Sequence, residues 1–163
     1  MTERTIILFR HGIAEDKDTK PDEERALTAA GRSRMKEIAA GLAACERRPD
    51  AIFTSPLVRC VETADRLSRA WKRGVSIFET DALRPQSGIK EFRGLLDQSQ
   101  ELERILCVGH EPNLTALMRA LTGARGKGAT ELKKGGCYGL FLPEEGPAAL
   151  EWMLPPRVLR RVR

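Results

Sequence analysis

The chain has 163 residues, of which 41% are hydrophobic and 31% are charged, so it is expected to form one soluble globular domain over residues 1–163 and is too apolar for a disordered chain. Lys and Arg outnumber Asp and Glu by 28 to 23, a formal net charge of +5 that favours acidic partners or anionic substrates. The longest apolar run near the start, Ile6–Phe9, is too short for a signal peptide or a membrane span, so we expect a cytoplasmic enzyme or binding domain without a membrane partner.

The first half of the chain alternates short apolar runs, typical of strands, with stretches that repeat apolar residues at helical spacing. In chain order, the predicted elements are a strand at Thr5–Phe9, a polar loop at Glu15–Arg25, a helix from Ala29 to about Ala44, a strand at Ala51–Thr54, a helix after Ser55-Pro56 and a strand at Val75–Phe78. Thr28 is typical of a helix N-cap. Ser55 followed by Pro56 is likewise typical of a capping hydroxyl with proline at the first helical position.

The second half continues the alternation and ends with two successive strands. In chain order, it predicts a helix from Ser87 to about Gln100, a strand at Ile105–Val108, a helix that opens at Pro112-Asn113, a loop at Gly123–Gly128, and strands at Cys137–Leu142 and Ala149–Leu154. The last two strands are predicted to be an antiparallel addition. Together these elements predict an α/β three-layer sandwich whose central sheet is mostly parallel, with helices on both faces.

Two motif classes are excluded by spacing. The Gly123–Gly128 loop lacks the GxxxxGK[ST] pattern of a phosphate-cradling loop and follows a helix rather than a strand. The four cysteines are scattered along the chain without a CxxC pair, at Cys45, Cys60, Cys107 and Cys137. We therefore expect reduced thiols that act as small apolar residues, and no zinc or redox site.

Cationic and polar side chains follow three of the predicted strands. Arg10 and His11 follow the first strand, Ser55 and Arg59 follow the second, and His110 follows Ile105–Val108. In an open α/β sheet ligands bind beyond the carboxyl ends of the strands, and each of these segments leads toward a helix N-terminus, which favours anions. Any one of these residues alone could be a surface or loop residue. Because the set includes both histidines of the chain, it predicts a site for a dianion such as a phosphoryl group.

These residues resemble a known family. Arg10-His11-Gly12 at the end of the first strand is the signature of the histidine phosphatase (phosphoglycerate mutase-like) superfamily. The supporting matches are Leu27-Thr28 with Gly31, Thr54-Ser55-Pro56 with Arg59, Glu62-Thr63-Ala64, and Val108-Gly109-His110 with Glu111-Pro112. The short chain and the segments RHGIAED, LTAAG and GHEPNL are most similar to SixA-type phosphohistidine phosphatases.

The resemblance implies a role for each residue of the predicted site. His11 would be the nucleophile that carries the phosphoryl group as a covalent phosphohistidine, which water then hydrolyses. Arg10, Arg59 and His110 would bind the non-bridging oxygens of the phosphoryl group. The two arginines would also disfavour the charged form of His11 and hold its pKa down, as nucleophilic attack requires. No metal and no cofactor are expected.

A proton donor for the leaving group is the part that does not match. Many superfamily members that cleave phosphomonoesters carry a glutamate after the third strand, where this chain offers only Glu79 and Asp81 as candidates. An imidazole leaving group needs less protonation than an alkoxide, so a missing acid favours phosphohistidine as substrate. The short span between Phe78 and Ile105 leaves no room for a cap domain, and an open site suits a protein-sized substrate such as a phosphotransfer domain.

Two other functions stay open from the sequence. The first is a small-molecule phosphomonoesterase acting on sugar phosphates or nucleotides, in which Glu79 or Asp81 would work as the acid. The second is a non-catalytic module that binds phosphate or polyanions. A basic C-terminal tail gives this reading some support, although such tails are usually solvated, and its residues are Arg157, Arg160, Arg161 and Arg163. No nucleic-acid partner is expected, and the pattern does not specify an oligomeric state.

Overall fold

A computed structural model describes residues 3–125 and 131–162 of the chain. One six-stranded sheet runs through the molecule in the order β3-β2-β4-β1-β5-β6. Its strands are β1 (Arg4–Arg10), β2 (Ala51–Thr54), β3 (Ile77–Glu79), β4 (Arg104–Gly109), β5 (Cys137–Leu142) and β6 (Ala149–Leu154). The first four strands pair in parallel, whereas β5 pairs antiparallel with both β1 and β6. The predicted antiparallel addition to a mostly parallel sheet is therefore confirmed.

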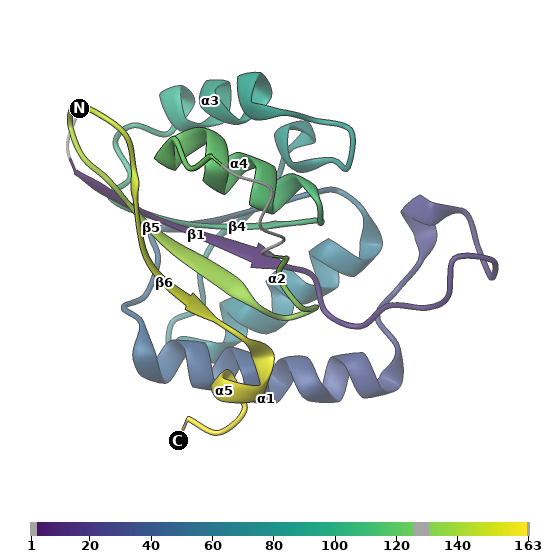
Figure 1. The fold of residues 1–163 in the computed structure, drawn as a ribbon. Coiled ribbons are helices and arrows are strands. Elements are labelled where there is room, and N and C mark those ends of the chain that lie inside the picture. Colours follow the sequence, from purple (N-terminus) through teal and green to yellow (C-terminus); the bar gives the residue numbers. More distant parts are fainter. Residues whose placement is uncertain (1–2, 126–130, 163) are drawn as a thin grey trace.

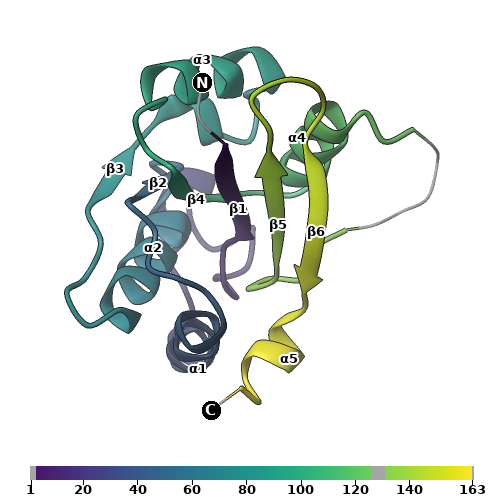
Figure 2. The ribbon, with the colours of Figure 1, turned by 90° about the vertical axis from the view of Figure 1, so that its left-hand side faces the viewer.

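Helices cover both faces of this sheet. The α-helices are α1 (Ala29–Cys45), α2 (Val58–Ala70), α3 (Ile89–Gln98), α4 (Asn113–Thr122) and the short α5 (Pro156–Leu159), and two 3-10 turns are η1 (Asp22–Glu24) and η2 (Asp81–Leu83). Figure 1 shows α3 and α4 on one face, and α1 and α2 on the other, with α5 beside α1. The view in Figure 2 shows the same separation of the helices by the sheet. This arrangement is the predicted three-layer α/β sandwich.

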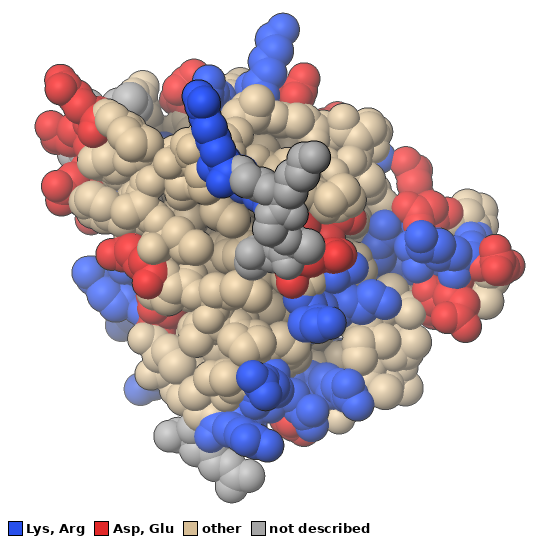
Figure 3. Space-filling model, viewed as in Figure 1, with Lys and Arg blue, Asp and Glu red and all other residues tan. Residues whose placement is uncertain are grey.

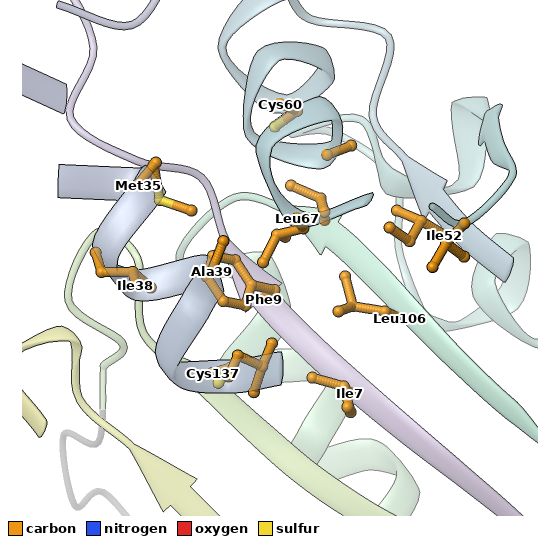
Figure 4. Packing of buried hydrophobic residues seen from close by; sticks show 14 of the residues in the cluster. Ile7, Phe9, Met35, Ile38, Ala39, Ile52, Cys60, Leu67, Leu106 and Cys137 are labelled. Carbon is orange, nitrogen blue, oxygen red and sulfur yellow. The ribbon is translucent and has the colours of Figure 1, made fainter. Parts of the chain in front are cut away.

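The strand β1 separates two hydrophobic cores. Ile7 and Phe9 pack with residues of α1 and α2, while Ile6 and Leu8 pack with residues of α3 and α4. Successive side chains of a strand point to opposite faces, so a strand buried on both faces is apolar at every position. Figure 4 shows Ile7 and Phe9 beside Met35, Ala39 and Leu67 in the first of these cores. The buried run Ile6–Phe9 thereby fixes β1 at the centre of the molecule.

Two details differ from the elements that the sequence predicts. The third strand is Ile77–Glu79, because Val75 is bound through its backbone N–H and C=O by the Ser68 hydroxyl instead of by a neighbouring strand. Helix α2 begins at Val58 with no side-chain cap, so Ser55 does not cap it. Part of the predicted Gly123–Gly128 loop lies outside the described residues. Thr28 does cap α1, since its hydroxyl accepts the backbone N–H of Gly31 at 2.9 Å.

The C-terminal arginines do not begin a free tail. Helix α5 packs on α1, its Leu159 is fully buried in the core, and the backbone of Leu159 lies so close to Gly41 that a Cβ there would come within 1.8 Å of the carbonyl oxygen. Arg157 and Arg160 are therefore carried by a fixed helix, while Arg163 lies outside the described residues. No helix in the described part of the chain is long and apolar enough to cross a membrane.

Candidate active site

The parallel register brings the predicted site residues to one edge of the sheet. Arg10 at the end of β1 pairs with Gly109 at the end of β4, and Thr54 at the end of β2 pairs with Val108. The pairing continues one residue further, because the His11 N–H donates to Gly109 O at 3.1 Å and the Ser55 N–H donates to Val108 O at 3.0 Å. The three segments that the sequence analysis singled out thus meet beyond the carboxyl ends of adjacent strands.

His11 is buried and holds a neutral imidazole with a defined tautomer. Its Nδ1 lies 2.7 Å from Gly12 O, and because a carbonyl only accepts hydrogen bonds, Nδ1 carries the proton. The lone pair of Nε2 is then available for attack. Burial, followed by the charges of His110, Arg59 and Arg10, lowers the pKa of His11 to about 3. The imidazole is therefore neutral, and nucleophilic, throughout the physiological pH range.

His110 lies beside His11, with 5.4 Å between the ring centroids. Its Nδ1 lies 3.3 Å from Arg59 Nη2, which can only donate, so Nδ1 accepts and the proton sits on Nε2. That Nε2 lies 2.8 Å from the Ser55 hydroxyl. Ser55 therefore contacts His110 and does not cap a helix, which was the role predicted from the sequence. Burial and the Arg59 charge lower the pKa of His110 to about 4.

Arg10 and Arg59 are both held by backbone carbonyls. Arg59 is only 4% exposed, and its Nη1 donates to Asp22 O at 2.7 Å while Nη2 donates to Asp22 Oδ2 at 3.1 Å. Arg10 donates through Nη1 to Leu132 O. The Nε atom of each arginine is buried without a hydrogen-bond partner among the described residues. Unsatisfied buried donors on two neighbouring guanidinium groups fit an anionic ligand.

The loop between β1 and α1 supplies residues that the sequence analysis did not single out. An antiparallel bridge between Ala14 and Leu27 closes this loop, and Arg25 fastens it internally by donating to Glu15 O and to the Asp22 carboxylate. The loop is drawn in purple at one side of Figure 1. Burial acts to raise the pKa of Asp22, but the hydrogen bonds from Arg25 and Arg59 prevail and hold it below its usual value. Asp22 therefore stays a carboxylate that offsets the charge of Arg59.

A hollow of about 240 Å³ opens over this edge of the sheet. It is lined by Arg10, His11, Ala14, Lys17, Asp22, Arg25, Arg59, Pro85, His110, Glu111 and Lys134. Five of these residues are Lys or Arg and two are acidic, so the hollow favours an anion. The structure thus brings together the four predicted site residues and surrounds them with further charged side chains, which are Lys17, Asp22, Arg25, Glu111 and Lys134.

Of the acidic candidates, the two named from the sequence lie outside this hollow. Glu79 and Asp81 are exposed and do not line it, and the Asp81 carboxylate accepts Arg84 Nε at 2.6 Å. Glu111 does line the hollow, is half-buried, and has a pKa raised by burial. Its carboxylate accepts the Thr115 hydroxyl and the Leu132 N–H, and the carbonyl of Leu132 in turn holds Arg10. Glu111 belongs to the GHEPNL segment that carries the family resemblance, but the sequence analysis did not name it as a candidate acid.

The remaining motif residues anchor the loop that carries His11. The Thr63 hydroxyl accepts the Gly12 N–H at 3.0 Å and donates to Arg59 O at 2.7 Å, so one side chain connects the loop that carries His11 to the helix that carries Arg59. Glu62 accepts the Leu27 N–H at 2.6 Å. Gly31 is required for close approach, because a Cβ at this position would lie 2.1 Å from Ile13 O.

The described residues contain no group of three His, Cys, Asp or Glu side chains placed to hold a metal ion. Within the same part of the chain the cysteines are free. The Cys60 sulfur lies 3.5 Å from His110 Nε2. Burial raises the pKa of Cys60 to about 12. Its thiol is therefore protonated and packs as a small apolar group.

A buried neutral histidine in a hollow that two guanidinium groups also line, at the carboxyl edge of an α/β sheet, is suited to the chemistry of phosphoryl transfer. The profile of the histidine phosphatase superfamily (branch 1) matches residues 6–89, and the chain belongs to this superfamily of phosphatase hydrolases. Family membership supports the phosphatase hypotheses rather than the non-catalytic module.

Similar proteins agree with this assignment. An uncharacterized protein of Picosynechococcus sp. is 32% identical over 138 residues, which are 83% of each chain. The protein histidine phosphatase SixA in complex with tungstate has the same fold, with a TM-score of 0.83, 20% identity, and coverage of 95% of this chain and 99% of that chain. An alpha-ribazole phosphatase from Shigella flexneri has a TM-score of 0.76 at 16% identity, over 93% of this chain and 96% of that one. The predicted phosphoglycerate mutase-like fold and resemblance to SixA are thus confirmed.

The low pKa values of the two histidines predict how stability depends on pH. Between about pH 4 and the ordinary histidine pKa of 6.5, the unfolded chain binds protons that the folded imidazoles exclude, so stability rises with pH in this window. We expect the free energy of unfolding, measured with urea, to fall by about 2 kcal/mol per imidazole from pH 7 to pH 5. In a variant with His11→Asn and His110→Asn, the free energy of unfolding should fall correspondingly less over the same pH range. Equal losses in both proteins would contradict this account.

Replacing Arg59 is expected to lower activity while the fold is retained. Arg59→Ala should lower kcat/KM for nitrophenyl phosphate by about 10²–10³, or about 3–4 kcal/mol, by analogy with removal of one oxyanion donor. Arg59→Lys should recover only part of this, because an ammonium group cannot reproduce the guanidinium fork. The matched control is Arg84→Ala, which removes an arginine paired with Glu23 and Asp81 outside the hollow. Similar effects of Arg59→Ala and Arg84→Ala would reject the role given to Arg59.

Proposed function

We propose that the protein hydrolyses phosphohistidine on another protein, in the manner of a single histidine phosphatase domain that spans the chain. The observation that carries the proposal is the surroundings of His11: an anion-binding hollow that neither Glu79 nor Asp81 lines. An alkoxide leaving group needs a strong proton donor, whereas the nitrogen of phosphohistidine can be protonated before the phosphorus–nitrogen bond breaks. The chemistry at hand therefore fits the phosphorus–nitrogen bond better than a phosphoester.

The reaction would proceed in two displacements at phosphorus. Nε2 of His11 attacks in line and forms a bond to phosphorus as the bond to the substrate imidazole breaks. The substrate ring, protonated beforehand on its other nitrogen, keeps the electron pair of the broken bond and leaves as neutral imidazole. Water then attacks the phosphoryl group on His11, inorganic phosphate leaves, and the free imidazole is restored. Arg10 and Arg59 would bind the non-bridging oxygens through their free Nε donors. A dianion beside His110 would raise the pKa of this histidine and let it donate as well.

The expected biological setting follows from this substrate class. Phosphohistidine is carried by phosphotransfer proteins, so this proposal assigns the chain to protein dephosphorylation in cytoplasmic signal transduction. The fold of the solved SixA supports the proposal, because that protein's name describes a protein histidine phosphatase.

A second candidate is hydrolysis of small phosphomonoesters, and Glu111 is the observation that favours it. A half-buried carboxyl group with a raised pKa on the wall of an anion-binding hollow is a candidate general acid. Its oxygens accept hydrogen bonds from Thr115 and Leu132, which favours a structural role instead. The similar fold of a phosphoserine phosphatase from Entamoeba histolytica, with a TM-score of 0.71, is compatible with either substrate class.

A substrate panel distinguishes the two candidates. We expect wild type to favour a phosphohistidine protein over an alkyl phosphate in kcat/KM, with nitrophenyl phosphate in between because nitrophenol departs without protonation. Glu79→Gln, Asp81→Asn and Glu111→Gln should each retain phosphohistidine turnover within a few-fold, whereas a true general acid contributes about 10²–10⁴-fold. Efficient turnover of the alkyl phosphate, lost by about two decades in one variant, would instead establish a phosphomonoesterase with that carboxylate as its acid.

A further inference from the structure

A second hollow lies beside the candidate active site, and every charged residue that lines it is a cation. It has a volume of about 140 Å³ and lies between the start of α1 and α5, and we name it the α1–α5 hollow. Its charged lining consists of Arg34, Lys134, Arg157 and Arg160. Gly12, the residue after His11, lines it as well, and Lys134 lines both this hollow and the catalytic one. The two hollows are therefore neighbours on one surface.

The cations of the α1–α5 hollow are mostly unneutralised. All four are exposed, and among the described residues only Arg160 of the four has an ion pair, with Glu37 at 2.7 Å. Arg34, Lys134 and Arg157 have no carboxylate of the described chain within 4.0 Å of their charged nitrogens. Figure 3 shows Lys and Arg gathered over α1 and α5, while the loop between β1 and α1 carries a mixture of both charges. Such an uncompensated patch attracts acidic groups.

The floor of the hollow is apolar. Met35, Ile38 and Pro156 form it, and Met35 and Ile38 also belong to the core beneath. An apolar floor with a cationic rim suits an acidic protein segment that places an apolar side chain between its carboxylates. A nucleic acid backbone would use the rim alone. Because α5 is packed on α1 through the buried Leu159, the rim is held in place before any partner binds.

We propose that the α1–α5 hollow is the docking surface for an acidic segment of the phosphoprotein substrate, next to its phosphohistidine. This inference rests on the proposed function and adds to it how the substrate is recognised. With the phosphoryl group on His11, the substrate surface that flanks it lies over Gly12 and Lys134, and its carboxylates meet Arg34 and Arg157. These contacts are remote from the reacting phosphorus, so they act on substrate binding and on KM rather than on the chemical step.

The test uses two synthetic peptides, each with one phosphohistidine and one nearby leucine. In the first, Asp and Glu flank the phosphohistidine on both sides, and in the second, Asn and Gln replace them. We expect wild type to favour the acidic peptide by about tenfold in kcat/KM, within the range of about 10–10³-fold that charge steering supplies. The preference should lie in KM and shrink with added salt, since the screening length falls to about 3 Å at 1 M.

Two double variants locate the preference on the surface. R34E with R157E should remove the preference and leave turnover of nitrophenyl phosphate unchanged, which also shows that the variant is folded. The matched control is K90E with R93E, which changes the net charge equally but on exposed positions of α3, across the sheet from α1. The control should keep the preference for the acidic peptide.

Each possible failure has a distinct meaning. If wild type turns over both peptides equally, or if the preference survives R34E with R157E, the docking surface is rejected while the phosphohistidine activity stands. Equal loss in the α3 control would reject it too, because net charge rather than the α1–α5 hollow would explain the preference. If neither peptide is turned over while an alkyl phosphate is, the proposed function fails and the docking surface fails with it.

Discussion

Six residue pairs join β1 to β4 in parallel, and the last of them places Arg10 opposite Gly109. This register puts the two histidines that follow the strands side by side, one residue beyond the sheet. A shift of one residue would exchange the side chains of β1 between the two hydrophobic cores, so the packing of Ile6–Phe9 in these cores also holds the register. The packing of the sheet therefore determines the distance between His11 and His110.

The electrostatics of the site follow from placing a base among cations. Burial and the guanidinium groups keep His11 uncharged, and the hydrogen bond from Nδ1 to Gly12 O leaves the other nitrogen free for attack. The cationic groups would repel one another without compensation, which the Asp22 carboxylate supplies by accepting Arg59 Nη2 at 3.1 Å. The same charges that suppress protonation of His11 also favour an anion in the hollow beside it. One arrangement thereby serves both binding and activation.

The positions of His11 and His110 could be predicted from the sequence because both follow apolar strands of unmistakable pattern. In a parallel sheet, residues that follow strands converge on one edge whatever the details of the loops. Asp22 and Arg25 could not be predicted, because their positions depend on a loop closed by the distant pairing of Ala14 with Leu27. Glu111 was hidden for a similar reason, since its role depends on a contact with Leu132.

The partner of the Ser55 hydroxyl and the short helix α5 were not predicted from the sequence either. Ser55 has the local pattern of a helix cap, but the arrival of His110 from β4 gives its hydroxyl another partner. The C-terminal arginines have the composition of a solvated tail, and only the burial of Leu159 against α1 turns them into part of a fixed surface. Local propensity was overridden in both cases by a long-range contact.

We propose that neutral His11 carries the phosphoryl group during turnover, and locating this group in enzyme quenched in alkali tests the proposal. Fragment mass spectrometry should find it on His11, with loss of the group on acidification, as expected of a phosphorus–nitrogen bond. A phosphoryl group on any other side chain, or an adduct stable in acid and lost in alkali, would contradict the account.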